Sequence, residues 1–305
     1  MKKYKIISRS FLLGCCILLA GCEKMVEFDV EKVTPYVVVH SKPEADSSVQ
    51  VRLAYSRFFL DNHAFRPIGN AEVQLYANGQ PLPRMSASDG CYRFDGSPKP
   101  GDSLTLQVRI PGYDLVEAGT SVPSLPDFEV LEALYDSISR SCRVKVRIHD
   151  PKGRNYYRIA FEGWEVEQQY GMGNDTVPSF ISFSSEDMVF TDATSLDYLL
   201  DGGQTIVNGR FLSFSDALFD GKAYTMEFDL MLWSAASIAD PSHPFHVRLS
   251  TLSRERYLYD RTLKQSFEQD EFLSEPVQIY TNVKGGIGIF AAAATKRMPI
   301  QAVVK

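Results

Sequence analysis

Residues 103–110 read Ser-Leu-Thr-Leu-Gln-Val-Arg-Ile. Leucine, valine or isoleucine occupies every second position, and polar residues occupy the positions between. Because side chains alternate between the two faces of a β-strand, this pattern predicts a strand with one buried face and a well-specified register. The same alternation recurs along the chain and predicts a mainly β protein. It is found at residues 49–55, 72–75, 143–148, 157–161, 226–232 and 245–249.

Turn dipeptides and a proline-rich break divide these strands into two domains. Asn78-Gly79 and Asp89-Gly90 are typical of type I′ turns, whose two central residues need positive φ. Such hairpins predict an antiparallel β-sandwich of immunoglobulin-like or prealbumin-like type at residues 35–122. Residues 123–127, Pro-Ser-Leu-Pro-Asp, predict a linker, because proline donates no ladder hydrogen bond and stiffens the chain. Residues 128–305 then form a second β-sandwich-like domain.

Residues 254–269 predict one helix within the second domain. They contain no glycine or proline and show no strand alternation. Tyr259, Leu263 and Phe267 recur at intervals of four, which places them on one face of a helix. We therefore expect an amphipathic helix whose Tyr259 face packs on the second sheet.

The first 22 residues predict a lipoprotein signal. Basic residues at positions 2, 3, 5 and 9 precede an apolar run at 11–19, which Ala20-Gly21-Cys22 follows. Small residues before a thiol suit a signal peptidase, so we expect residues 1–21 to be removed and Cys22 to carry lipid. The apolar run is shorter than the roughly 20 residues of a membrane-spanning helix. An ordinary signal peptide with a chance cysteine is the alternative.

After this processing the chain would be strongly acidic. Residues 22–34 would form an acidic tether, and removing residues 1–21 changes the net charge from −6 to −10, because that segment holds four basic residues and no acid. Such a charge repels phosphate groups, so neither nucleic acid nor anionic lipid is an expected partner. The acyl chains on Cys22 would supply the attachment to the membrane.

Two further cysteines, Cys91 and Cys142, would remain in the processed chain. The cell envelope permits a disulfide between them if their Cα atoms lie within roughly 7 Å. Two unpaired thiols buried as small apolar groups are the alternative.

The sequence lacks the common motifs of enzymes and metal sites. It contains no Gly-x-Ser-x-Gly, no His-Glu-x-x-His and no phosphate-binding loop. His243 and His246 lie close together with Asp240 upstream, but an ordinary polar loop explains them without a metal. Carboxylates that meet in space, as in glycosidases, are an open alternative. We predict no catalytic residue, no metal site and no cofactor.

Aromatic residues make up 12% of the chain, and many lie in or beside loop-like stretches. Aromatic side chains at such places bind sugars or protein partners, although aromatics that cap the ends of two sandwiches would give the same pattern. We choose Phe58 and Trp164 as the first candidates for contact with a ligand or partner. The whole group comprises Phe58, Phe59, Phe65, Trp164, Tyr170, Phe180, Phe183, Phe211, Phe214 and Phe219.

Several short motifs, taken in order, resemble those of uncharacterised lipoproteins of Bacteroidetes-type outer membranes that are known only as a domain of unknown function. The resemblance spans nearly the whole mature chain. It rests on residues 36–39 (Tyr-Val-Val-Val), 68–73 (Ile-Gly-Asn-Ala-Glu-Val), 155–158 (Asn-Tyr-Tyr-Arg), 214–216 (Phe-Ser-Asp), 220–222 (Asp-Gly-Lys), 275–277 (Glu-Pro-Val), 280–283 (Tyr-Thr-Asn-Val) and 286–290 (Gly-Ile-Gly-Ile-Phe).

This resemblance implies a role in the cell envelope. The family has no established activity or catalytic residues, and its members tend to be encoded beside TonB-dependent outer-membrane receptors. The acidic residues that follow Cys22 are similar to export tags that send such lipoproteins to the cell surface, although a solvated tether would have the same composition.

We therefore expect a non-enzymatic, lipid-anchored protein of the outer membrane, exposed at the cell surface. It would serve a TonB-dependent uptake system as an accessory or as a partner that binds a glycan or peptide ligand. Two alternatives stay open. A surface hydrolase of glycan or peptide would need a cleft with converging carboxylates or a Ser-His pair, and a structural component of a surface assembly would need an open edge strand.

Overall fold

The computed structural model describes residues 34–58, 63–168, 174–190, 207–232, 244–268 and 277–304. The predicted signal peptide, Cys22, nearly all of the predicted tether and His243 lie outside these ranges. The described residues fall into two compact units. One unit contains Phe58 with Thr34 and Pro35, and the other contains the remaining described residues, to which the following paragraphs refer.

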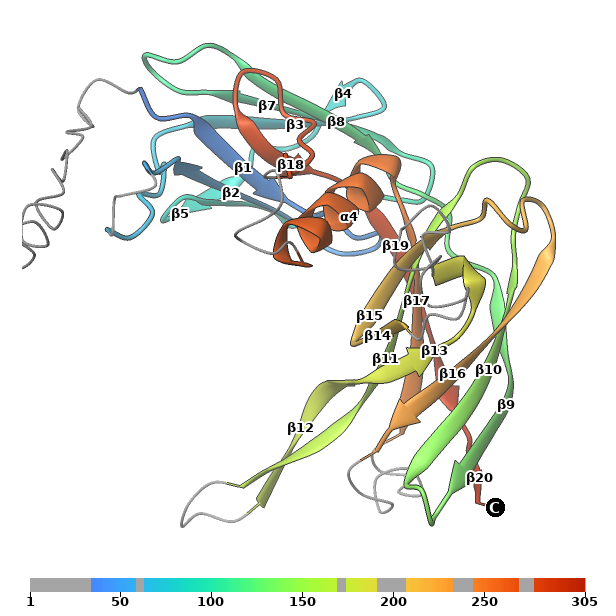
Figure 1. Cartoon of the computed structure of the whole chain (residues 1–305). Helices are drawn as coiled ribbons and strands as arrows, with labels where there is room; N and C mark the ends of the chain where they lie inside the picture. Colours follow the sequence, from blue (N-terminus) through green and yellow to red (C-terminus); the bar gives the residue numbers. More distant parts are fainter. Residues whose placement is uncertain are drawn as a thin grey trace, which may run out of the picture. The chain divides into compact units, whose positions relative to one another are not determined.

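Two sheets form a first β-sandwich, as the alternating sequence predicts (Figure 1). The sheet order is β18-β1-β2-β6-β5 in one layer and β4-β3-β7-β8 in the other. The residue 103–110 stretch supplies β7, where Leu104, Leu106 and Val108 are each at most 1% exposed. The strands are β1 (Val37–Ser41), β2 (Val49–Tyr55), β3 (Glu72–Ala77), β4 (Gln80–Pro81), β5 (Ser86–Ser88), β6 (Cys91–Phe94), β7 (Ser103–Arg109), β8 (Val116–Ser121) and β18 (Ile287–Phe290).

Both predicted hairpin turns have the backbone that their sequences require. Asn78 and Gly79 have φ values of 52° and 77°, and Asp89 and Gly90 have values of 45° and 71°. Two consecutive residues with positive φ are the mark of the type I′ turn, which matches the twist of the flanking strands. These turns fix the pairing of β3 with β4 and of β5 with β6.

The first sandwich is completed by a segment from the other end of the sequence. β18 pairs in parallel with β1, and Val283, Phe290 and Ala292 belong to the first hydrophobic core. A division at residues 123–127 alone would assign this segment to the second domain. Gly288 has a φ of +114°, and a Cβ there would lie 2.0 Å from the Val39 carbonyl oxygen. The absence of a side chain at Gly288 therefore permits the backbones of β18 and β1 to approach closely.

A second sandwich contains the larger hydrophobic core. One layer has the order β14-β13-β16-β10-β9-β20, and the other has the order β12-β11-β17-β19 with β15 paired to β11. Phe161, Phe183 and Phe228 meet edge to face at its centre, with ring centroids 4.9–5.5 Å apart. Its elements are β9 (Phe128–Asp136), β10 (Ser141–His149), β11 (Tyr156–Gln168), β12 (Asn174–Ile181), β13 (Phe183–Ser185), η2 (Met188–Phe190), β14 (Val207–Gly209), β15 (Phe211–Ser215), β16 (Ala223–Met231), β17 (Phe245–Leu252), β19 (Ala293–Ile300) and β20 (Val303–Val304).

The predicted helix is present as α4 (Arg254–Glu268). The Ser253 hydroxyl accepts a hydrogen bond from the Arg256 backbone N–H at 3.2 Å, which caps the first turn. α4 contacts β18 of the first sandwich and β11, β15 and β17 of the second (Figure 1). The buried face of α4 matches the predicted Tyr259 face only in part. Phe267 of the predicted face is 80% exposed, whereas Arg256, which was not predicted to pack, is 7% exposed. An ion pair between Arg256 and Asp260 allows a charged residue to occupy the buried position.

Cys91 and Cys142, the two cysteines within the described ranges, are unpaired. Cys91 lies half-buried in β6 and Cys142 lies fully buried in β10, so they belong to different sandwiches. Burial raises the pKa of the Cys142 thiol to about 11, and such a thiol is unreactive at neutral pH. Across the described ranges, no helix has both the length and the apolar character needed to cross a membrane.

Candidate functional site

The outward face of the β11 sheet carries charged and aromatic side chains together. Tyr157, Ile159 and Phe161 point into the second core, so the alternate residues of β11 point outward. These outward residues include Arg158, Glu162 and the predicted candidate Trp164, whose side chain is half-buried. We call this surface the arginine–aromatic face; it comprises Arg158, Glu162, Phe180, Phe211, Arg248 and Arg297.

Arg158 is held by partners on two neighbouring elements. Its Nε donates a hydrogen bond to the Ser213 hydroxyl of β15 at 3.3 Å, and its Nη2 donates to the Asp260 carboxylate of α4. The guanidinium carbon also lies 5.0 Å from the ring centroid of Phe211, which is 56% exposed. An arginine over an aromatic face gains a cation–π attraction, so this stacking fixes both side chains.

A second arginine repeats this arrangement across the sheet. Arg248 of β17 reaches over β11, donates to the Glu162 carboxylate at 3.3 Å and lies 6.0 Å from the ring centroid of Phe180. Arg297 of β19 forms a second ion pair with Glu162 at 3.0 Å. Phe180 remains 38% exposed. Glu162 therefore holds two cations in place beside an accessible ring.

This geometry suits recognition of a partner molecule. Aromatic and arginine side chains are enriched at the centres of protein interfaces, where they supply apolar contact area and directed hydrogen bonds. The ion pairs and ring contacts limit the rotamers of both arginines, so less conformational entropy is lost when a ligand binds. The other predicted candidate, Phe58, is half-buried after β2 in the unit that does not contain Trp164.

Three carboxylates meet at the opposite end of β11. Oxygen atoms of Asp150, Asp216 and Asp220 lie within 4.8 Å of one another, a spacing that could hold a metal ion. No sequence pattern singles out these three residues as a group, although Asp216 and Asp220 fall in the Phe-Ser-Asp and Asp-Gly-Lys motifs. Burial raises the pKa of Asp216, and the charge of Asp150 adds to the shift.

The hydrogen bonds that these three carboxylates accept give the cluster a structural role. Asp150 accepts hydrogen bonds from the Tyr157 hydroxyl at 2.5 Å and from the Gly221 backbone N–H at 2.8 Å. Asp216 accepts from the Asn155 N–H at 2.6 Å, and Asp220 accepts from the Gly153 N–H at 2.9 Å. The cluster thus ties the loop before β11 to the turn that links β15 and β16.

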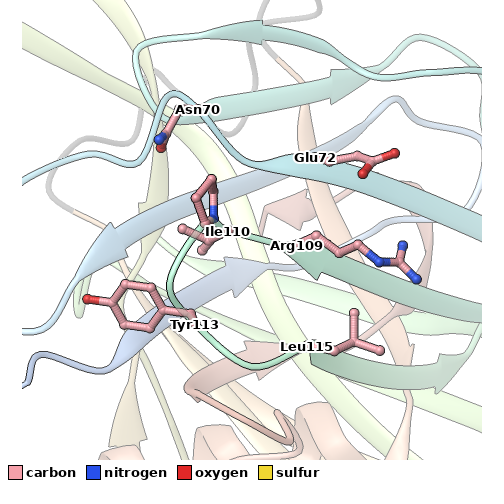
Figure 2. Close-up of a pocket in the computed structure, with 7 residues that line it drawn as sticks. Asn70, Glu72, Arg109, Ile110, Tyr113 and Leu115 are labelled. Carbon is pink, nitrogen blue, oxygen red and sulfur yellow. The ribbon is translucent and has the colours of Figure 1, made fainter.

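A shallow groove of about 430 Å³ lies on the first sandwich. Figure 2 shows Tyr113 and Ile110 at one end, with Glu72 and Arg109 side by side on neighbouring strands at the other. Tyr113 also packs against Tyr55, with ring centroids 5.6 Å apart. The groove is lined by Asn70, Glu72, Arg109, Ile110, Pro111, Tyr113 and Leu115. Its size falls in the lower range of ligand sites, and Glu72 and Arg109 are its charged side chains.

Comparison with known proteins identifies a family and little beyond it. Residues 23–298 match the family described as Domain of unknown function (DUF4249). No curated protein matches the sequence.

Three solved structures with detectable similarity resemble the chain only loosely. A protein of Corynebacterium diphtheriae described as membrane anchored has 11% identity and a TM-score of 0.21, with 72% of this chain and 55% of that chain covered. A Bacteroides uniformis beta-glucuronidase has 8% identity and a TM-score of 0.18, with 67% and 31% covered. A beta-glucuronidase from glycoside hydrolase family 2 has 12% identity and a TM-score of 0.18, with 84% and 22% covered. The chain thus spans about half or less of the length of these structures.

Proposed function

The chain belongs to the DUF4249 family, a domain of unknown function, and on this premise we propose that it is a lipid-anchored, non-enzymatic binding protein of the outer membrane. Lipid on Cys22 holds it at the membrane, and the two sandwiches present binding surfaces at the cell surface. Its partner is a TonB-dependent receptor, which it serves by binding a glycan or peptide ligand. The signal sequence and the acidic tether support the location.

The arginine–aromatic face is the observation that supports a binding role most directly. Phe180 and Phe211 are accessible aromatic rings, and each is stacked with an arginine that an ion pair restrains. Ordinary solvent-facing strands carry polar side chains, so two exposed phenylalanines on the outward side of one sheet indicate contact with something other than water.

Capture from outer membrane tests this proposal. The tagged, lipidated chain is purified from detergent-solubilised outer membrane, and its partners are identified by mass spectrometry. We expect a TonB-dependent receptor to copurify with the native chain and to be lost with the Phe180→Ala/Phe211→Ala variant. Phe65→Ala is the matched control, because Phe65 is 59% exposed and stacked under Arg57 but lies on the first sandwich.

Two further measurements complete the test. Cys22→Ser should move the protein from the membrane fraction to the soluble fraction, since the chain would lack its acyl anchor. The purified chain should also bind members of a glycan or peptide panel through the same face. Recovery without any receptor, combined with no binding across the panel, would contradict the proposal.

A further inference from the structure

A buried arginine at the start of α4 has an unused hydrogen-bond donor. Arg256 is 7% exposed, and its Nε donates to the Asp260 carboxylate at 3.2 Å. Its Nη1 is buried and has no hydrogen-bond partner. A guanidinium has five N–H donors, and a buried donor without an acceptor is unfavourable, particularly on a charged group.

Further basic groups surround Arg256. Lys42 follows β1, its Nζ lies 4.8 Å from the ring centroid of Tyr259, and it forms no ion pair with any residue in the described part of the chain. Burial and the positive charge of Arg256 lower the pKa of Lys42 to about 8. Desolvation and the charges of Lys42 and Arg256 likewise lower the pKa of His40. Arg256 is therefore close enough to repel both neighbours.

The acidic groups nearby do not balance these cations. Asp260 is shared, because it accepts from both Arg158 and Arg256. Glu44, the next carboxylate, accepts from the Thr295 hydroxyl at 2.7 Å and faces Arg248 at 4.0 Å. Lys42, Arg158 and Arg256 thus share Asp260 in a partly desolvated place, and the charge of Glu44 also acts on Arg158. Three cations still outnumber two carboxylates there, and excess charge of one sign is costly.

We propose that Lys42, Arg158 and Arg256 form a binding site for a small oxyanion, either a carboxylate or a phosphate group. The ligand would accept from the free Nη1 of Arg256 and from Nζ of Lys42, and its negative charge would offset the excess of cations. The four-carbon stem of Lys42 allows its ammonium to move aside for entry and then to close on the ligand. The site needs no partner protein, so it stands independently of the function proposed above.

Anion binding by the purified, full-length mature chain tests this proposal. Thermal unfolding and titration calorimetry are performed with sodium phosphate, with sodium acetate and with sodium chloride at equal ionic strength. We expect a saturable rise in melting temperature with phosphate or acetate that chloride does not produce. A preference for phosphate assigns a phosphate group, and a preference for acetate assigns a carboxylate.

Variants locate the site. Lys42→Gln removes a half-buried cation without disturbing the core and should weaken anion binding at least about tenfold, the effect of one charge-assisted hydrogen bond. Arg256→Gln should weaken binding similarly, provided that its circular dichroism spectrum matches that of the native chain. Lys99→Gln is the control, because Lys99 is an exposed lysine paired with Asp46. Absence of oxyanion-specific binding to the native chain, or undiminished binding to Lys42→Gln, would overturn the proposal.

Discussion

Arg158 links three elements through one side chain. It extends from β11, bonds Ser213 of β15 and pairs with Asp260 of α4, and its side chain is 20% exposed. Its position in the Asn-Tyr-Tyr-Arg motif fits this linking role, although the sequence alone gave no sign of its partners.

Replacing Arg158 should show how much its contacts contribute to the free energy of unfolding. Arg158→Ala removes the donor to the Ser213 hydroxyl and one of the two donors to Oδ2 of Asp260, so we expect a loss of about 1–3 kcal/mol in the free energy of unfolding. Urea denaturation followed by circular dichroism measures it. Arg93→Ala is the comparison, because Arg93 pairs with Asp95 on an exposed surface, where such pairs contribute at most about 1 kcal/mol. Equal losses in the two variants would contradict the assignment.

Lys42 should make stability depend on pH above neutrality. Its pKa is lowered from 10.5 to about 8 in the folded chain, so between these values the unfolded chain binds more protons. Stability from this group therefore rises as the pH increases through about 8 and levels off near 10.5. Melting temperatures at pH 7.5 and 9 should show a smaller rise for Lys42→Met than for the native chain. Parallel profiles for the two proteins would show that Lys42 does not titrate in this range.

At the level of elements, sequence patterns correctly predicted individual strands, turns and the helix. The strand at residues 103–110 became β7, the Asn78-Gly79 turn formed as expected and the helix lies within one residue of its predicted bounds. The inward face of α4 was harder to predict. Arg256 lies on it because Asp260 pairs with its charge and because α4 packs against strands that are distant in sequence. A periodicity argument treats charged residues as solvent-exposed and cannot detect such a pair.

Gly288 should be essential to the pairing of β1 with β18. A methyl group there would collide with the Val39 carbonyl oxygen, and φ is also positive. We expect Gly288→Ala to destabilise the chain by about 4 kcal/mol or more, the range in which a substitution disrupts packing. Gly79→Ala is the matched control, with a φ of +77° but open space around its Cβ, and should cost only about 1–2 kcal/mol. Chemical denaturation compares the two, and similar losses would show that backbone contact at Gly288 is unimportant.

At the level of the whole molecule, the order of the strands in each sheet could not be predicted from the sequence. Alternation identifies a strand and its buried face but contains no information on which distant strand lies beside it. The pairing of β18 with β1 and the ion pair between Glu162 and Arg248 both depend on such distant neighbours. Trp164 was selected as an aromatic in or beside a loop, but it lies within strand β11. The ion pairs that Glu162 forms with Arg248 and Arg297 of other strands could not be predicted.

The first sandwich should therefore not fold as an isolated piece. A fragment of residues 35–122 lacks β18 and the core side chains Phe290 and Ala292, which leaves the β1 edge open. We expect this fragment to show no cooperative thermal transition and to associate in solution, as measured by calorimetry and light scattering. The full mature chain serves as the reference. A monomeric fragment that melts cooperatively near the same temperature would contradict the expectation.

The junction of β1 with β18 also determines when folding can finish. A ribosome makes the chain from its N-terminus, so the sheet and core of the first sandwich cannot be completed until residues 283–292 have been made. Contacts between segments so far apart form slowly, because a long loop has to close first. During synthesis the first sandwich thus stays incomplete until nearly the whole chain has been made.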